Sequence, residues 1–183
     1  MWKNIGYEKC LSFINCQLQP AAKPVDHAIK PAITLSRQTG AGGRTVAGRL
    51  AEYLQSHAPV QCAWTVFDKN LMAKVLEDHH LSQRVAKYEP ETHKPFFRDW
   101  MEEFLELHPS TWNVVRDTAE TIWQLASMGN VIIVGRGGAV VTASMKNVLH
   151  VRLVGSLERR IAHVQEFYNL DAKAAAEFVK TED

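Results

Sequence analysis

Three glycines within four residues, Gly40, Gly42 and Gly43, are the clearest chemical signal in this sequence. They follow a short β-prone run over 32–36 and precede a helical pattern over 45–54. Glycines in such a loop let successive backbone N–H groups turn towards a phosphate, and the N-terminus of the following helix adds its dipole. A plain strand-to-helix turn needs fewer glycines. The pattern therefore predicts an anion-binding loop between the strand and the helix.

Two glycine fingerprints match this loop in part. The dinucleotide-binding pattern G-x-G-x-x-G fits Gly40 and Gly42, but its third glycine falls on Thr45. The Walker pattern G-x-x-x-x-G-K-[ST] would place its last glycine at Gly42 and its lysine at Gly43. The residue types thus indicate phosphate binding and leave both a mononucleotide and a dinucleotide open.

Two further polar residues, Asp68 and Arg136, come directly after other predicted strands. Because ligands of parallel α/β sheets bind at the carboxyl ends of the strands, we expect both residues to lie at the same sheet edge as the glycine loop. Each also has a simpler role open to it. Asp68 is well placed to cap the helix that follows. The alternative role for Arg136 is to cap a helix or to lie on the surface.

Short apolar strands alternate with longer helical stretches along most of the chain. Such strands, separated by helices, indicate a parallel sheet covered on both faces. Cap residues mark two helix ends: Gly129 closes one helix, and Asp171 caps the last one. The predicted strands cover 32–36, 61–67, 131–134 and 148–154; the predicted helices cover 45–54 and 70–76 and begin again at 110, at 157 and after Asp171. The segment 79–108 is polar and broken by prolines, and predicts one or two short helices.

Apolar spacing in two of these helices predicts the residues that face the core. The positions recur every three or four residues, as one face of a helix requires. They are Val46, Leu50 and Leu54 in the first helix, and Val115, Ala119, Ile122 and Ala126 in the helix that begins at 110.

The composition is that of an ordinary globular domain, with 183 residues of which 46% are hydrophobic. A formal net charge of +1 argues against nucleic acid or an anionic membrane surface as a partner. No apolar run approaches the roughly 18 residues of a membrane helix. Three cysteines, none in a C-x-x-C pair, are too few for a disulfide framework, which favours a reducing, cytoplasmic setting.

Residues 1–30 differ from the rest of the chain. A short amphipathic helix is predicted over 7–14, and several prolines interrupt regular structure after it. We expect a leader that packs on the surface or contacts a partner, followed by one domain over residues 31–183.

Four motifs stand in collinear order between residues 31 and 183. They are Ser36-Arg37-Gln38-Thr39-Gly40-Ala41-Gly42-Gly43-Arg44, Phe67-Asp68-Lys69-Asn70-Leu71, Val134-Gly135-Arg136-Gly137-Gly138, and Val148 to Val154 with Ser156-Leu157-Glu158-Arg159-Arg160. Together they resemble the cytidylate kinase-like family, a divergent branch of the P-loop nucleoside monophosphate kinases. The resemblance implies a three-layer α/β fold with a parallel sheet. We expect about four strands here, with the C-terminal edge strand and the lid missing, because the chain ends at Asp183 where related kinases have their lid.

The resemblance also implies phosphoryl transfer from Mg²⁺-bound ATP to a small nucleotide acceptor. The phosphate-binding residues would be Ser36, Arg37, Thr39, Gly40, Ala41, Gly42, Gly43, Arg44 and Thr45, with the Thr45 hydroxyl meeting Mg²⁺. Gly43 stands where better-known cytidylate kinases have the phosphate-binding lysine. We expect Arg44, or Arg37 from the front of the loop, to supply the missing cation.

On the acceptor side, the resemblance assigns Arg136 to the acceptor phosphate and Asp68 to a position near it. Arg44, Asp68 and Arg136 are therefore the expected catalytic residues. The acid that would recognise cytosine is replaced by Gly137, so the sequence leaves the identity of the acceptor open. The lid-side arginine expected after Arg160 is His163, while Arg159 and Arg160 lie either near ATP or on a solvated helix face.

Three functions remain open from the sequence. The first is an ATP-dependent phosphotransferase that acts on a nucleoside monophosphate. The second is a nucleotide-binding module without catalysis, which Gly43 and Gly137 favour. The third is a dinucleotide-binding protein with Asp68 on a ribose.

Overall fold

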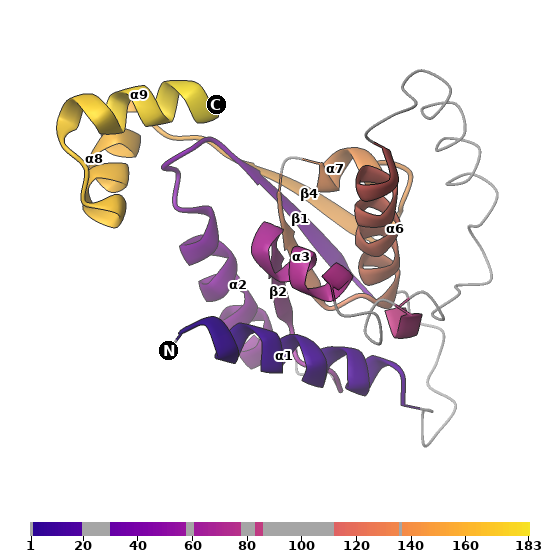
Figure 1. Ribbon diagram of the computed structural model, residues 1–183. Helices are drawn as coiled ribbons and strands as arrows, with labels where there is room; N and C mark the ends of the chain where they lie inside the picture. The colour runs from indigo at the N-terminus through magenta and orange to yellow at the C-terminus, as the bar shows by residue number, and fades with distance from the viewer. Residues whose placement is uncertain (1, 20–29, 58–60, 78–82, 86–111, 136) are drawn as a thin grey trace.

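The computed structural model describes residues 2–19, 30–57, 61–77, 83–85, 112–135 and 137–183, and its centre is a four-stranded parallel sheet (Figure 1). The strands are β1 (Ala32–Arg37), β2 (Thr65–Asp68), β3 (Val131–Val134) and β4 (Val148–Leu153). Their order across the sheet is β2-β3-β1-β4, and every neighbouring pair is parallel. In register, Leu35 of β1 pairs with Val134 on one side and Val151 on the other. The predicted α/β class and parallel sheet are confirmed.

Helices cover both faces of this sheet, as the continuous apolar strands predicted. On one face, α1, α3 and α6 bury a core that includes Phe13, Phe67 and Leu125. On the other, α2 packs Ala47 and Ala51 against β1 and β3. The helices are α1 (Trp2–Gln17), α2 (Gly43–His57), α3 (Lys69–Glu77), α6 (Trp112–Met128), α7 (Gly138–Val141), α8 (Leu157–Tyr168) and α9 (Ala172–Glu182).

The last two helices form a hairpin beyond the end of β4, close to the loop that leaves β1 (Figure 1). The hairpin has a small core of its own, in which Val164 packs with Ala175 and Val179. The predicted N-cap of α9 is confirmed, because the Asp171 side chain accepts a hydrogen bond at the start of that helix. The Ser156 side chain caps the start of α8 in the same way. Both helices therefore begin where the sequence predicted.

The core faces of two helices differ in part from the prediction. Val46 and Val115 were expected in the core, but their side chains are 39% and 48% exposed. In α2 the buried positions are Ala47 and Ala51, because these small side chains let the helix lie close against the sheet. Leu50 and Leu54 pack at the edge of the same cluster. In α6 the predicted positions Ala119, Ile122 and Ala126 are buried.

Strand β2 is shorter than the predicted run over 61–67. Its partner β3 has only four residues, and Thr65 pairs with Val131 at its start. Residues before Thr65 therefore have no strand to pair with. Of the predicted middle segment 79–108, residues 83–85 form a short helical turn, and the rest lies outside the described residues.

The N-terminal helix α1 is longer than the predicted helix over 7–14 and contributes to the main core through Cys10 and Ile14. Its last turn places Cys16 beside Cys62, with the two Cα atoms 5.7 Å apart, and the two sulfurs form a disulfide. The cysteine count did not predict this pairing, so it no longer supports a reducing compartment. Within the described residues, no helix has both the length and the apolar character that a membrane crossing requires.

Candidate functional site

The loop between β1 and α2 has the backbone shape that its glycines allow. Gly40 (φ +81°) and Gly42 (φ +75°) both lie in the left-handed region, which strains residues with a side chain. The N–H of Ala41 donates to the carbonyl of Gln38 (3.1 Å), and the N–H of Val46 donates to the carbonyl of Gly42 (3.0 Å) as α2 begins. The loop therefore turns at the N-terminus of a 15-residue helix, where N–H groups and the helix dipole favour an anion.

A cavity of about 210 Å³ lies over this loop. Residues 37–45 line one side of it, and side chains of the α8–α9 hairpin, among them His163 and Phe167, line the other. Of the predicted phosphate-binding residues, all but Ser36 therefore line one cavity. The glycine pattern predicted the loop, but the aromatic wall opposite it was not expected.

Helix α8 contacts the loop directly at Gly40. A Cβ atom on Gly40 would lie 2.4 Å from the carbonyl oxygen of Arg160, so only glycine fits this approach. The Nδ1 atom of His163 lies 2.9 Å from the Gly40 carbonyl oxygen and donates a hydrogen bond to it. His163, which stands where the family's lid arginine was expected, thus fixes the loop instead of facing solvent.

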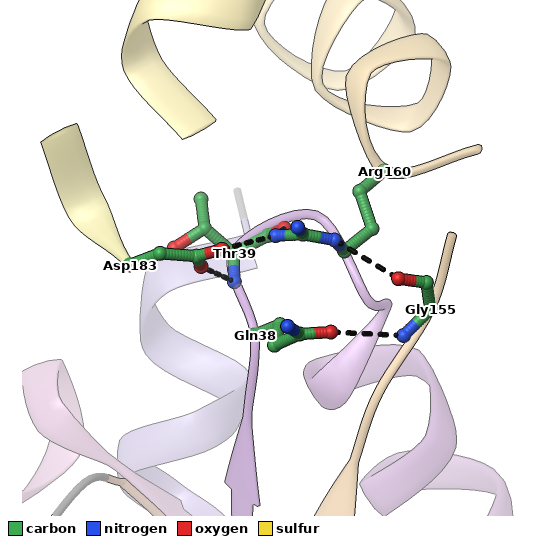
Figure 2. Close-up of polar contacts among 5 residues, drawn as sticks. All are labelled: Gln38, Thr39, Gly155, Arg160 and Asp183. Carbon is green, nitrogen blue, oxygen red and sulfur yellow. Dashed lines mark hydrogen bonds and ion pairs between the residues drawn. The ribbon is translucent and has the colours of Figure 1, made fainter. Parts of the chain in front are cut away.

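Polar contacts among five residues join the front of the loop to the hairpin (Figure 2). The Arg160 guanidinium donates to the carbonyl oxygens of Thr39 and Gly155, both at 3.2 Å, and forms an ion pair with Asp183. The Asp183 carboxylate also accepts a hydrogen bond from the Thr39 backbone N–H at 2.7 Å. Gln38 accepts one from the Gly155 N–H at 3.1 Å. The hairpin therefore holds the loop at Thr39, and the β4–α8 connection holds the neighbouring Gln38.

The two arginines that begin α8 have different roles. Arg159 is exposed, as a solvated helix face predicts. Arg160 is only 7% exposed, and its guanidinium binds the loop and pairs with Asp183. The hydrogen bond from the Thr39 backbone, followed by the neighbouring Arg160, holds the pKa of the Asp183 carboxyl below its ordinary value. Asp183 therefore stays ionised at neutral pH.

The two candidate cations of the loop point to different places. The Arg44 guanidinium forms an ion pair with Asp68 at 2.7 Å, while the other Asp68 oxygen caps α3 by accepting the Leu71 N–H at 2.9 Å. The capping role predicted for Asp68 is thus confirmed. The Arg37 stem lies over Gly43: a Cβ there would be 3.1 Å from the Arg37 Cγ and 3.2 Å from its Cδ. Arg37 therefore occupies the space next to the position of the missing lysine.

The two hydroxyl residues at the ends of the loop, Ser36 and Thr45, also lie in different surroundings. Ser36 donates to the Val151 carbonyl at 3.3 Å and so links β1 to β4. Thr45 is exposed in the first turn of α2 and lines the cavity, and its hydroxyl is an oxygen ligand of the kind that would hold a Mg²⁺ ion. The described residues contain no cluster of three or more His, Cys, Asp or Glu side chains that would hold a metal by itself. Arg136 lies outside the described residues.

Comparisons with known proteins agree with this architecture. The model of the cytidylate kinase-like family matches residues 32–183, and no curated protein matches the chain. An uncharacterized protein from Eubacterium ventriosum ATCC 27560 has a similar structure, with a TM-score of 0.59 and 21% identity over 83% of this chain and 73% of that one. The TT1252 protein from Thermus thermophilus gives a TM-score of 0.45 and 12% identity over 84% and 81%. The first of these likenesses supports the fold alone.

Proposed function

Because the chain belongs to the cytidylate kinase-like family, we propose that it transfers the γ-phosphoryl group of ATP to a nucleoside monophosphate or a related small acceptor. Family membership supports a nucleotide kinase-like function in general terms. The finer assignment, to this donor and this class of acceptor, is our proposal. The observation that carries it is the loop at Gly40 and Gly42, which turns at the N-terminus of α2 beneath a cavity that the loop itself lines.

The size of the cavity supports an assignment to phosphate groups. Its volume of about 210 Å³ is below the roughly 300–1,000 Å³ of pockets that enclose a whole drug-sized ligand. Phosphates bound there would meet backbone N–H groups on the loop and the positive end of the α2 dipole. The base and ribose would extend away from the loop towards the rim of the cavity.

We assign the phosphate-binding charge to Arg37. Phosphoryl transfer needs charge next to the transferred group, and a guanidinium offers two parallel donors to phosphate oxygens. Arg37 and Arg44 both line the cavity, but the Arg44 guanidinium pairs with Asp68, whereas the Arg37 stem lies over Gly43. Arg37 would therefore do the work of the missing lysine, with a fork of donors in place of a movable point charge.

Two further roles complete the proposal. Thr45 would hold Mg²⁺, which neutralises charge on the donor phosphates when it is bound. The Arg44–Asp68 pair, at the carboxyl end of β2, would orient the acceptor together with Arg136. In this arrangement the protein supplies position and charge, and needs no covalent step of its own.

Purified protein incubated with Mg²⁺, ATP and a panel of nucleoside monophosphates tests the proposal. We expect phosphoryl transfer to at least one acceptor, and a drop in kcat/KM of about 100-fold or more for Arg37→Met. The Arg49→Met variant, which changes an exposed arginine on α2, serves as the matched control and should keep its activity. Absence of turnover with every acceptor would contradict the proposed reaction, and equal activity of Arg37→Met and the control would contradict the role of Arg37.

A second candidate function is nucleotide binding without turnover, which the glycine at position 43 favours. A binding module would shift its melting temperature with ATP or ADP and form no product, so the same assay separates the two functions. Nothing in the described residues favours the dinucleotide alternative, because both oxygens of Asp68, the residue expected on a ribose, already have protein partners.

A further inference from the structure

A row of aromatic rings runs along the α8–α9 hairpin from the phosphate loop outwards. Its members are His163, Phe167 and Tyr168 of α8 and Phe178 of α9, and all four line the cavity over the loop. Neighbouring ring centroids are 6.1, 5.0 and 5.1 Å apart along the row, within the range of direct aromatic contact. The row begins at His163, which is hydrogen-bonded to Gly40.

Packing of the hairpin does not explain the middle of this row. The small core of the hairpin consists of Val164, Ala175 and Val179, with Phe178 among the residues around it. Phe167 and Tyr168 are outside that core, and their side chains are 61% and 53% exposed. Large exposed aromatic side chains that gather at one place usually mark a binding surface.

We propose that Phe167 and Tyr168 form a stacking platform for the base of the nucleotide whose phosphates the loop binds, an inference that rests on the proposed function. The phosphates occupy the side of the cavity that the loop lines, so the base lies on the side that Phe167 and Tyr168 line. Phe167 is one helical turn beyond His163, about 6 Å along the axis of α8, a distance that a ribose bridges. The Phe167 and Tyr168 rings are inclined at 76° to each other, so the base stacks on the face of one ring and contacts the edge of the other.

Stacking on aromatic faces also fits the way in which a nucleotide would be held here. Every nucleobase has a flat π face, so a platform of rings adds affinity without selecting one base. The loop would provide the phosphate affinity and the platform the affinity for the nucleoside. These two contributions are separable, because inorganic triphosphate contains the first group and lacks the second.

Isothermal titration calorimetry with ATP and with inorganic triphosphate, on the 183-residue chain, tests the platform. We expect the unmodified protein to bind ATP about tenfold more tightly than triphosphate. In the double variant Phe167→Leu/Tyr168→Leu this preference should disappear, while the affinity for triphosphate stays the same. The matched control is Tyr53→Leu, an exposed tyrosine on α2 that stacks on His57, and it should keep the preference.

The outcomes distinguish this inference from the proposed function. A double variant that binds triphosphate normally and still prefers ATP would overturn the platform and leave the phosphate site intact. An unmodified protein that binds neither ligand would overturn the proposed function and the platform with it. If the double variant does not fold, as judged by circular dichroism, the single Phe167→Leu variant replaces it, and a preference for ATP reduced at least threefold supports the platform while an unchanged one refutes it.

Discussion

Replacing Gly40 with alanine tests whether the phosphate loop and α8 are packed as closely as the structure shows. The matched control is Gly42→Ala, because both glycines have nearly the same positive φ, +81° and +75°. Their surroundings differ. A Cβ on Gly40 would lie 2.4 Å from the Arg160 carbonyl oxygen, whereas the nearest atom to a Cβ on Gly42 is a His163 carbon at 4.0 Å.

The two variants should therefore differ in their free energy of unfolding. The left-handed conformation costs an alanine roughly 1–2 kcal/mol, and the stiffer unfolded chain returns about 0.4–1 kcal/mol, so Gly42→Ala should destabilise by about 1 kcal/mol. Gly40→Ala has the same cost and must also move the loop or α8 by about 1 Å to reach ordinary contact. That movement would break the hydrogen bonds of the loop to His163 and Arg160, each worth about 1 kcal/mol. We expect a total near 3 kcal/mol.

Urea denaturation of the two variants measures this difference directly, and a thermal scan should show Gly40→Ala melting several degrees below Gly42→Ala. Because the loop would be displaced, Gly40→Ala should also lose most of its affinity for inorganic triphosphate. Equal stability of the two variants would refute the close packing of the loop against α8.

Three further predictions concern the stability of the fold. Arg160→Met leaves the Thr39 carbonyl and Asp183 without their buried cation, so urea denaturation should show a free energy of unfolding about 2–3 kcal/mol lower. A decrease below about 0.5 kcal/mol would contradict the role of Arg160 in holding the loop. Asp68→Asn keeps the helix cap and breaks only the ion pair with the exposed Arg44, so it should lower the free energy of unfolding by less than about 1 kcal/mol. Asp68→Ala also removes the cap and should lower it by about 1 kcal/mol more. A smaller loss for Asp68→Ala than for Asp68→Asn would be inconsistent with the cap. Burial raises the pKa of Cys10 to about 12 from 9.0, so the free energy of unfolding should fall as the pH rises from about 9 towards 12. The Cys10→Ala variant should lose less stability over the same pH range. Identical pH profiles of the two proteins would refute the effect of burial on the Cys10 thiol.

Much of the fold follows from local signals in the sequence. The apolar runs that became β1 and β3 are continuous because these are the two central strands of a parallel sheet covered on both faces. The Asp171 cap was predictable because one side chain satisfies a backbone N–H within the same turn. The length of β2 was not predictable, since it depends on the four-residue partner β3.

The candidate site shows the same division between local and distant contacts. The left-handed loop could be predicted because only glycine adopts that conformation at low cost. The contacts of Arg160 with the loop could not be predicted, because its partners are the Thr39 carbonyl, 121 residues away, and Asp183, 23 residues away. The Cys16–Cys62 pair, 46 residues apart, depends in the same way on how α1 packs. Residue type alone does not identify such partners.

The missing lysine and the position of Arg37 are adjacent in space. A side chain at position 43 would begin 3.1 Å from the Arg37 Cγ, closer than most side-chain contacts, so a lysine there would require the Arg37 stem to shift by a few tenths of an ångström. The sequence favoured Arg44 as the cation, with Arg37 as the second candidate, and the ion pair of Arg44 with Asp68 leads us to propose Arg37 instead. Because Arg37 would supply the cation from the end of β1, the first turn of α2 would contribute its backbone N–H groups to the phosphates. Under our proposal Gly43 is compatible with a working phosphate site, because Arg37 would supply the charge from the strand that precedes the loop.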